Sequence, residues 1–91
     1  MTHAIILIEA ERDAMSTLGG RLAEIEHVGQ VYSVTGEWDF VVLVHLPRHD
    51  MLAEVVNGDI GRLDGVSRTL TMVAFEAFSR HDLEAVFSIG Q

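Results

Sequence analysis

Cysteine is absent from this 91-residue chain, and proline occurs only once. Without cysteine the chain forms no disulfide, thiolate nucleophile or cysteine-based zinc site. A small domain without disulfides fits a reducing compartment. The first apolar run, residues 4–8, is too short for a signal-peptide core or a membrane-spanning helix. We therefore expect a cytoplasmic protein with no membrane partner.

Positive charge is also scarce. The chain has six arginines, no lysine and 14 acidic residues, which gives a formal net charge of −8. Nucleic-acid backbones and anionic membranes are bound by clustered basic side chains, and the arginines here are scattered along the chain. We expect no direct binding of nucleic acid.

Five histidines invite the idea of a metal site. They are His3, His27, His45, His49 and His81. None of them forms the i, i+4 pair on a helix that is typical of zinc sites. No Ser–His–Asp or paired-carboxylate arrangement follows from the spacing either. The sequence therefore predicts no metal ligand, no cofactor and no catalytic residue.

The length and composition predict a single folded domain over residues 1–91. Apolar residues make up 48% of the chain against 22% charged residues, which is typical of a globular protein. Burial alone stabilises a domain of this size only marginally, and assembly with further copies is a common remedy.

Residues 31–46 organise the chain. Two β-rich runs flank a polar turn, residues 36–39, and this pattern predicts a β-hairpin. Gly36 supplies a backbone conformation that larger residues resist, and Asp39 is suited to accept hydrogen bonds from backbone N–H groups. The sole tryptophan, Trp38, lies in this turn with Glu37 and Asp39. The tip is the first place to look for a small-molecule site.

The other periodic segments complete a β-α-β-β-α-β order, with strands also expected over residues 3–10 and 66–78. A first helix is expected over residues 13–26, with Asp13 as its N-cap. Its apolar face would consist of Met15, Leu18, Leu22 and Ile25. Gly19 and Gly20 inside it indicate close backbone packing. Pro47 ends the third strand, and a second helix runs from residue 48 or 49 to residue 56 or beyond.

This order is the ferredoxin-like α+β arrangement, a four-stranded antiparallel sheet with two helices on one face. Its third strand is apolar on both sides, since Val41 and Leu43 alternate with Phe40, Val42 and Val44. Helices cover only one face, and a bare apolar sheet face is unusual in a monomer. We therefore expect a homodimer in which two sheets pack face to face.

Two segments carry a family resemblance. Residues 31–44 (VYSVTGEWDFVVLV) and 61–76 (GRLDGVSRTLTMVAFE), within this topology, resemble the C-terminal effector domain, or RAM domain, of Lrp/AsnC (feast/famine) transcriptional regulators. The resemblance covers residues 4–78 and is strongest at residues 35–39 and 65–71. It indicates a stand-alone domain that lacks the family's helix-turn-helix, with residues 80–91 as a C-terminal extension. The spacing of Leu83, Val86 and Phe87 predicts a short helix over residues 80–87.

The resemblance implies an αβ-sandwich dimer that assembles into higher oligomers and binds an amino acid or a related small molecule between dimers. It also implies a full-length Lrp/AsnC regulator as a partner. Carried over to this chain, the ligand-binding residues are Gly36, Glu37, Trp38, Asp39, Thr69 and Thr71. Backbone N–H groups at the glycine turn suit a carboxylate, and the acidic side chains suit an ammonium group. Trp38 replaces the family's commoner tyrosine or phenylalanine.

Each of these residues also has a plain structural interpretation. The tip would then be an ordinary tight turn, Trp38 an anchor in a subunit interface, and the threonines ordinary strand residues. Arg68 would pair with Glu37, Asp39 or Asp64.

Two alternatives to a binding module stay open at this point. One is a small dimeric α+β barrel enzyme, similar to cofactor-independent monooxygenases or isomerases, which would need His45 or Tyr32 in a cavity between helices and sheet. The other is a purely structural oligomer without a ligand.

Overall fold

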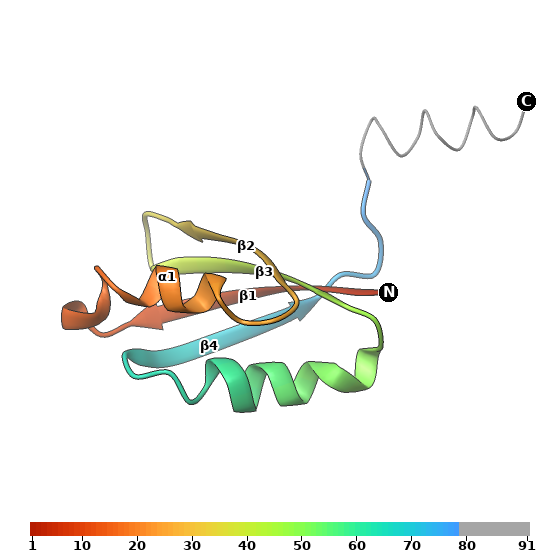
Figure 1. Cartoon of the computed structure of the whole chain (residues 1–91). Coiled ribbons are helices and arrows are strands. Elements are labelled where there is room, and N and C mark those ends of the chain that lie inside the picture. The colour runs from red at the N-terminus through yellow and green to blue at the C-terminus, as the bar shows by residue number, and fades with distance from the viewer. Residues whose placement is uncertain (79–91) are drawn as a thin grey trace, which may run out of the picture.

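The computed structural model describes residues 1–78 of the chain (Figure 1). Its elements in chain order are β1 (Thr2–Ala10), η1 (Arg12–Ala14), α1 (Leu18–Ala23), β2 (Val28–Ser33), β3 (Phe40–Leu46), η2 (His49–Met51), η3 (Glu54–Ile60) and β4 (Val66–Val73). Short 3₁₀ turns form η1 and η2, and η3 has π-helical hydrogen bonding.

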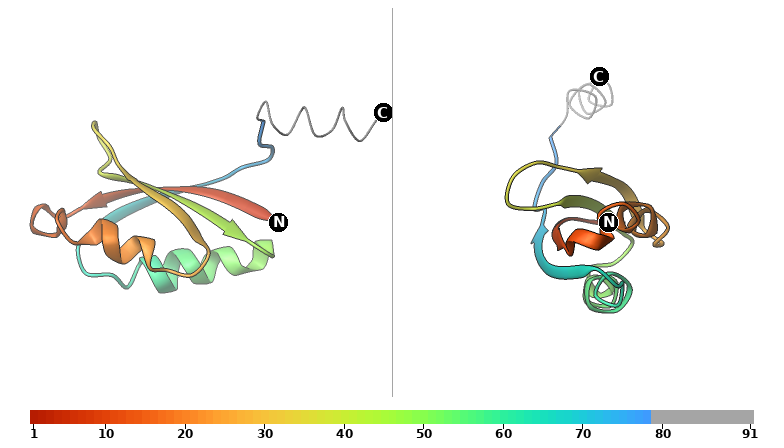
Figure 2. Two further views of the ribbon diagram at one scale, coloured as in Figure 1. Left: turned by 45° about the horizontal axis from the view of Figure 1, so that its top comes forward. Right: turned by 90° about the vertical axis from the view of Figure 1, so that its left-hand side faces the viewer.

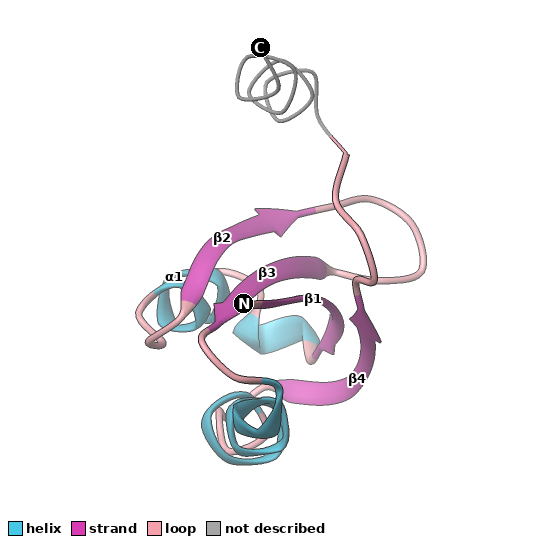
Figure 3. Cartoon of the chain, turned by 90° about the vertical axis from the view of Figure 1, so that its right-hand side faces the viewer, coloured by secondary structure: helices cyan, strands magenta, loops and turns pink. Residues whose placement is uncertain are grey.

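The four strands form one antiparallel sheet in the order β2-β3-β1-β4. Figures 2 and 3 show α1 and the helical run of η2 and η3 on the same side of this twisted sheet. The predicted ferredoxin-like α+β fold is therefore confirmed. Of the two central strands, β3 has the expected bounds and β1 begins one residue before the expected range of 3–10.

The core lies between the sheet and the helices. The inward side chains of β1 and β3 are Ala4, Ile6, Ile8, Phe40, Val42, Val44 and Leu46. From the helical side the buried residues are Ala14, Leu18, Leu22, Val55 and Ile60. No polar or charged side chain is buried within residues 1–78. This apolar layer is the main source of stability, since burial from water is the dominant favourable contribution to folding.

The first helix is shorter than predicted. The prediction of one helix over residues 13–26 was wrong, because only Leu18–Ala23 is α-helical and Asp13 makes no side-chain cap hydrogen bond. Met15 lies outside the core with 38% of its surface exposed. Two consecutive glycines disfavour a longer helix. Gly19 is nevertheless required, since a Cβ there would lie 3.1 Å from Cε1 of Phe40.

The second helix continues further than its turn signal suggested. Asn57 and Gly58 do not end it, and Ile60 extends the apolar face and is fully buried. At the other side of the fold, β2 begins at Val28, and β4 ends at Val73 rather than at residue 78. The predicted C-terminal helix over residues 80–87 lies outside the described residues. No helix of the described part is long and apolar enough to cross a membrane.

The sheet face opposite the helices, called the open face below, carries cross-strand rows of side chains. Strand register places Leu70, Leu7, Val41 and Tyr32 in one row and Met72, Ile5, Leu43 and Gln30 in the next. Leu70 and Met72 are 46% and 43% exposed in the single chain. Polar residues lie at both ends of this apolar surface. Glu9 is opposite Arg68 at one end, and His3 is opposite His45 at the other.

Gly65 gives a direct test of how β4 is positioned. Its φ is +98°, and a Cβ there would collide with Ala14. We expect Gly65→Ala to lower the free energy of unfolding by at least about 1–3 kcal/mol, because left-handed strain adds to a steric clash. Urea unfolding followed by circular dichroism measures this.

Gly58→Ala is the matched control, because nothing lies within 4 Å of a Cβ at that helical position. It should leave stability unchanged or raise it by up to about 1 kcal/mol. Equal effects of the two substitutions would contradict the placement of Gly65 against Ala14.

Candidate functional site

Asp39 fixes the hairpin tip to the C-terminal end of β1, a central strand of the sheet. Its backbone N–H donates to the carbonyl of Ile8 (2.9 Å), and its own carbonyl accepts from the N–H of Val34 (3.0 Å). Its Oδ2 accepts a hydrogen bond from the backbone N–H of Ala10 at 2.7 Å. This contact lies where the β1–β4 register shifts, between Glu9 and Ala10. The β1–β3 ladder ends at the pair of Ile8 and Phe40, so Asp39 supplies a partner for the next backbone donor on that side of β1.

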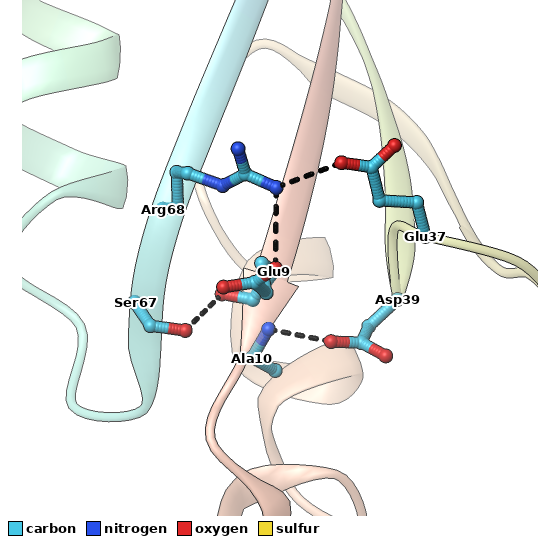
Figure 4. A network of polar contacts seen from close by, with 6 residues as sticks. All are labelled: Glu9, Ala10, Glu37, Asp39, Ser67 and Arg68. Carbon is cyan, nitrogen blue, oxygen red and sulfur yellow. Dashed lines mark hydrogen bonds and ion pairs between the residues drawn. The ribbon is translucent and has the colours of Figure 1, made fainter.

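Arg68 joins the tip to the neighbouring strands. Figure 4 shows its guanidinium extending from β4 over β1 toward Glu37. Its Nη2 lies 3.2 Å from Oε2 of Glu9 and 3.2 Å from Oε1 of Glu37. Its Cζ lies 4.4 Å from the centroid of the Trp38 ring, which is a cation–π contact. We call Glu9, Glu37, Trp38, Asp39 and Arg68 the tip cluster.

The backbone of β1 is also tied to β4 next to this cluster. The Ser67 hydroxyl donates to the Glu9 carbonyl at 2.8 Å, and the N–H of Glu11 donates to the carbonyl of Gly65 at 2.7 Å. Gly36 has a φ of +107°, as its place in the turn predicts. The tip is therefore a defined local structure with hydrogen bonds to β1.

The charges of the tip cluster are mixed. Three carboxylates and one guanidinium leave a formal surplus of two negative charges (−3 + 1). The hydrogen bond to Glu37, followed by the field of Glu9, raises the pKa of Arg68 above its ordinary value, so this side chain stays charged. Its Nε and Nη1 make no hydrogen bond within the described residues. The cluster thus offers both free N–H donors and carboxylate acceptors.

Thr69 and Thr71 lie on the other side of the sheet. Each pairs with an inward residue of β1, Thr69 with Ile8 and Thr71 with Ile6, so both threonines face the helices. Thr71 lines a groove of about 290 Å³ together with His49, Leu52, Ala53, Val56 and Asn57. Within one chain, the fold brings together Gly36, Glu37, Trp38 and Asp39 but not the two threonines.

A second hollow of about 210 Å³ lies beside the start of β4. It is lined by Glu11, Asp13, Ala14, Thr17, Arg21, Asp64 and Gly65. Neither of these two hollows includes a residue of the tip cluster. Glu37 and Arg68 are instead exposed on the surface. A ligand at the tip would therefore be covered from one side only by this chain.

His45 and Tyr32 lie on the open face, away from the helices. His45 pairs with His3, and Tyr32 pairs with Val41, whose neighbours in the sequence face the core. The enzyme alternative requires these side chains in a cavity between helices and sheet, and the fold places them on the opposite face.

Glu9 is a member of the site that no local sequence signal predicts. The interpretation that Arg68 pairs with Glu37 is confirmed, and pairing with Asp39 or Asp64 is not observed among the described residues. Only the β1–β4 register, which places Glu9 directly opposite Arg68, brings it into the cluster.

Comparison with known proteins gives a consistent result. The family described as the Lrp/AsnC ligand binding domain matches residues 3–83. An uncharacterised helix-turn-helix-type transcriptional regulator of Pyrococcus abyssi is 31% identical over 78 residues, which cover 82% of this chain and 52% of that protein. A similar regulator of Pyrococcus furiosus is 34% identical over 73 residues, 80% of this chain and 49% of its own length. The chain thus spans about half the length of the curated relatives it matches.

Solved structures share the fold. A protein of Thermus thermophilus is 42% identical, with a TM-score of 0.82, and the match covers 88% of this chain and all of that one. Escherichia coli AsnC has a TM-score of 0.80 at 20% identity, covering 87% of this chain and 54% of AsnC. A Neisseria meningitidis transcriptional regulator, solved as a complex with L-methionine, has a TM-score of 0.78 at 15% identity, covering 87% of this chain and 53% of the regulator.

The contact between Asp39 and Ala10 should be measurable in stability. We expect Asp39→Ala to lower the free energy of unfolding by about 1–2 kcal/mol, because it leaves a part-buried backbone N–H without its charged acceptor. Asp39→Asn keeps an acceptor oxygen and should recover part of this loss.

Asp50→Ala is the control, since Asp50 pairs with Arg48 on the exposed surface. Its effect should stay below about 0.5 kcal/mol. If Asp39→Ala were as mild as Asp50→Ala in urea unfolding, Asp39 would not hold the tip to β1.

Proposed function

The chain belongs to the Lrp/AsnC ligand-binding domain family, and we propose that it binds an amino acid or a related small zwitterion and assembles through the open face of its sheet. In this proposal it is a non-enzymatic effector module. The observation that carries it is the tip cluster, where carboxylates and a guanidinium with unused donors meet at the rim of an apolar surface.

The chemistry of the tip cluster fits an amino acid. The ligand carboxylate would bind the Nε and Nη1 donors of Arg68, which the contacts to Glu9 and Glu37 leave over. The ligand ammonium would bind the exposed carboxylate of Glu37. The surplus of negative charge favours a ligand that brings a positive group. Gly36, Trp38 and Asp39 would shape the tip around it.

A second copy would complete the site. The tip cluster lies outside both hollows described above, so a ligand there needs cover from another subunit. Thr69 and Thr71 remain in the proposal as ligand residues that a neighbouring copy would contribute, since they face away from the tip within one chain. This arrangement agrees with a ligand site between dimers.

Dimerisation through the open face is supported by its side chains. Leu70 and Met72 are nearly half exposed in the single chain, and they continue the apolar rows of Ile5, Leu7 and Val41. Monomers rarely expose contiguous apolar surfaces of this kind. The rows are flanked by polar residues, as the core of a protein interface is by its rim.

The regulatory role follows from the relatives. The curated relatives are transcriptional regulators about twice as long as the matched region. We place the protein in the cytoplasm as a partner of a full-length regulator of this family, which it would modulate through mixed assembly and ligand binding. The net charge of −8 is consistent with a role that does not involve direct contact with DNA.

Ligand binding should raise thermal stability. We expect one or more of the twenty amino acids to stabilise the protein, by about 2.7 kcal/mol at 100 times the dissociation constant. Differential scanning fluorimetry of the purified protein against each amino acid gives the shift. Glu37→Gln should abolish the shift while leaving the unliganded melting temperature unchanged.

Two further variants locate the ligand. Glu54→Gln removes an exposed carboxylate on η3 and should keep the shift. Thr71→Val tests whether the ligand binds in the groove rather than at the tip. Loss of the thermal shift in this variant, but not in Glu37→Gln, would place the ligand site in the groove. The proposal fails if no amino acid causes a shift, or if the shift survives Glu37→Gln.

Assembly should depend on the open face. We expect Leu70→Glu to convert the dimer to a monomer, because it places a charge within one of the apolar rows of the open face. Sedimentation equilibrium measures the mass, which is 10.0 kDa for one chain. Ala53→Glu, an exposed position on the helical side, should keep the dimer. Dimers of equal stability in both variants would exclude the open face as the interface.

A further inference from the structure

Two histidines lie side by side at the end of the open face that is remote from the tip cluster. His3 of β1 and His45 of β3 are direct cross-strand partners. Their Nδ1 atoms are 2.5 Å apart, and their rings meet edge to face with centroids 4.7 Å apart. Only one hydrogen fits between the two nitrogens, so at least one Nδ1 presents a lone pair to the other ring.

We propose that His3 and His45 form a binding site for a divalent transition-metal ion, such as Zn²⁺, Ni²⁺ or Cu²⁺. The ion would replace the hydrogen between the two Nδ1 atoms. The histidine that gives up this hydrogen would take up a proton from solvent at its Nε2, so both rings would bind the ion as neutral imidazoles with no net release of protons. Imidazole nitrogen is a preferred ligand of these ions, whereas Mg²⁺ prefers oxygen.

The required movement is small. Metal–nitrogen bonds of about 2.0–2.1 Å in tetrahedral or square geometry separate two ligand nitrogens by about 3 Å. A slight rotation of the exposed rings opens the present 2.5 Å separation to this value. The two side chains therefore already point their ligand atoms at one place.

The backbone holds this pair in position. β1 and β3 are the two central strands of the sheet, so both Cα atoms are fixed by ladder hydrogen bonds. The ring of His45 lies against Gly29 of β2, where a Cβ would come within 2.7 Å of Cδ2 and 2.9 Å of Nε2. Gly29 thus keeps the space that lets His45 turn Nδ1 toward His3. The backbone N–H of His45 is bonded to the carbonyl of His27 at 2.9 Å.

The site is an open one. No group of three or more potential ligands gathers within residues 1–78, so the pair supplies two ligands and leaves the other positions to water or to another molecule. A closed structural zinc site has four protein ligands. We therefore expect exchangeable binding with a stability gain on loading. The inference does not depend on amino-acid binding, since His3 and His45 lie at the opposite end of β1 and β3 from the tip.

Isothermal titration of tag-free protein with Zn²⁺, Ni²⁺ and Mg²⁺ tests this site. We expect Zn²⁺ and Ni²⁺ to bind with a measurable heat and Mg²⁺ to give no heat of binding. His3→Gln and His45→Gln should each weaken Zn²⁺ binding by an order of magnitude or more. The double variant should be little weaker than either single variant, because one missing ligand already destroys the chelate.

His49→Gln is the matched control, an exposed histidine on η2 outside the pair. It should bind Zn²⁺ like the wild type, and all variants should keep the wild-type melting temperature without metal. With Cu²⁺, electron paramagnetic resonance should show coupling to two imidazole nitrogens, and to one in His3→Gln. Unchanged Zn²⁺ affinity in both single variants, or an equal loss in His49→Gln, would overturn the proposal.

Discussion

The structure depends on one constraint, which is that a four-stranded sheet with apolar side chains on both faces has helices on only one of them. β1 and β3 send Ile6, Ile8 and Val42 into the helix-covered core, where they are fully buried. The same strands present Ile5, Leu7 and Leu43 on the open face. Burial of apolar surface is the dominant favourable term in folding and association alike. We therefore propose that a second copy of the chain forms a second layer on this face.

The positions of the polar side chains follow from this constraint. The apolar rows end at Glu9 and Arg68 on one side and at His3 and His45 on the other. Asp39 holds the hairpin tip against β1 at the end where Glu9 and Arg68 lie. The tip brings Glu37 and Trp38 into contact with Arg68 there. The polar side chains are thus concentrated at the two ends of the open face, where the rim of a protein interface would be partly solvated. The apolar surface proposed for assembly and the polar groups proposed for binding thus share one small sheet.

The positions of β3 and of the hairpin turn were predictable from the sequence, because local residue preferences there agree with the tertiary packing. The alternation in residues 40–46, the turn at Gly36 and the break at Pro47 fixed β3 and the hairpin, and the structure follows them. Local rules failed at Met15 and Asp13, where Gly19 and Gly20 shorten the helix. They also failed at the end of β4, where the hydrogen bond from the N–H of Ala74 to the carbonyl of His3 lies beyond the last residue of the strand, Val73. The role of Glu9 follows from strand register, and so does the separation of Thr71 from the tip. Alternation alone showed that the threonines share one side but not that this side faces the helices.

Oxidation of Met72 relative to Met15 tests the central claim most directly. The two side chains have similar exposure in the single chain, 43% and 38%, but only Met72 lies on the open face. If a second copy covers that face, brief treatment with hydrogen peroxide followed by mass spectrometry will show Met72 oxidised much more slowly than Met15. Equal rates for the two methionines at a protein concentration well above that needed for assembly would show the open face to be bare and would contradict the account.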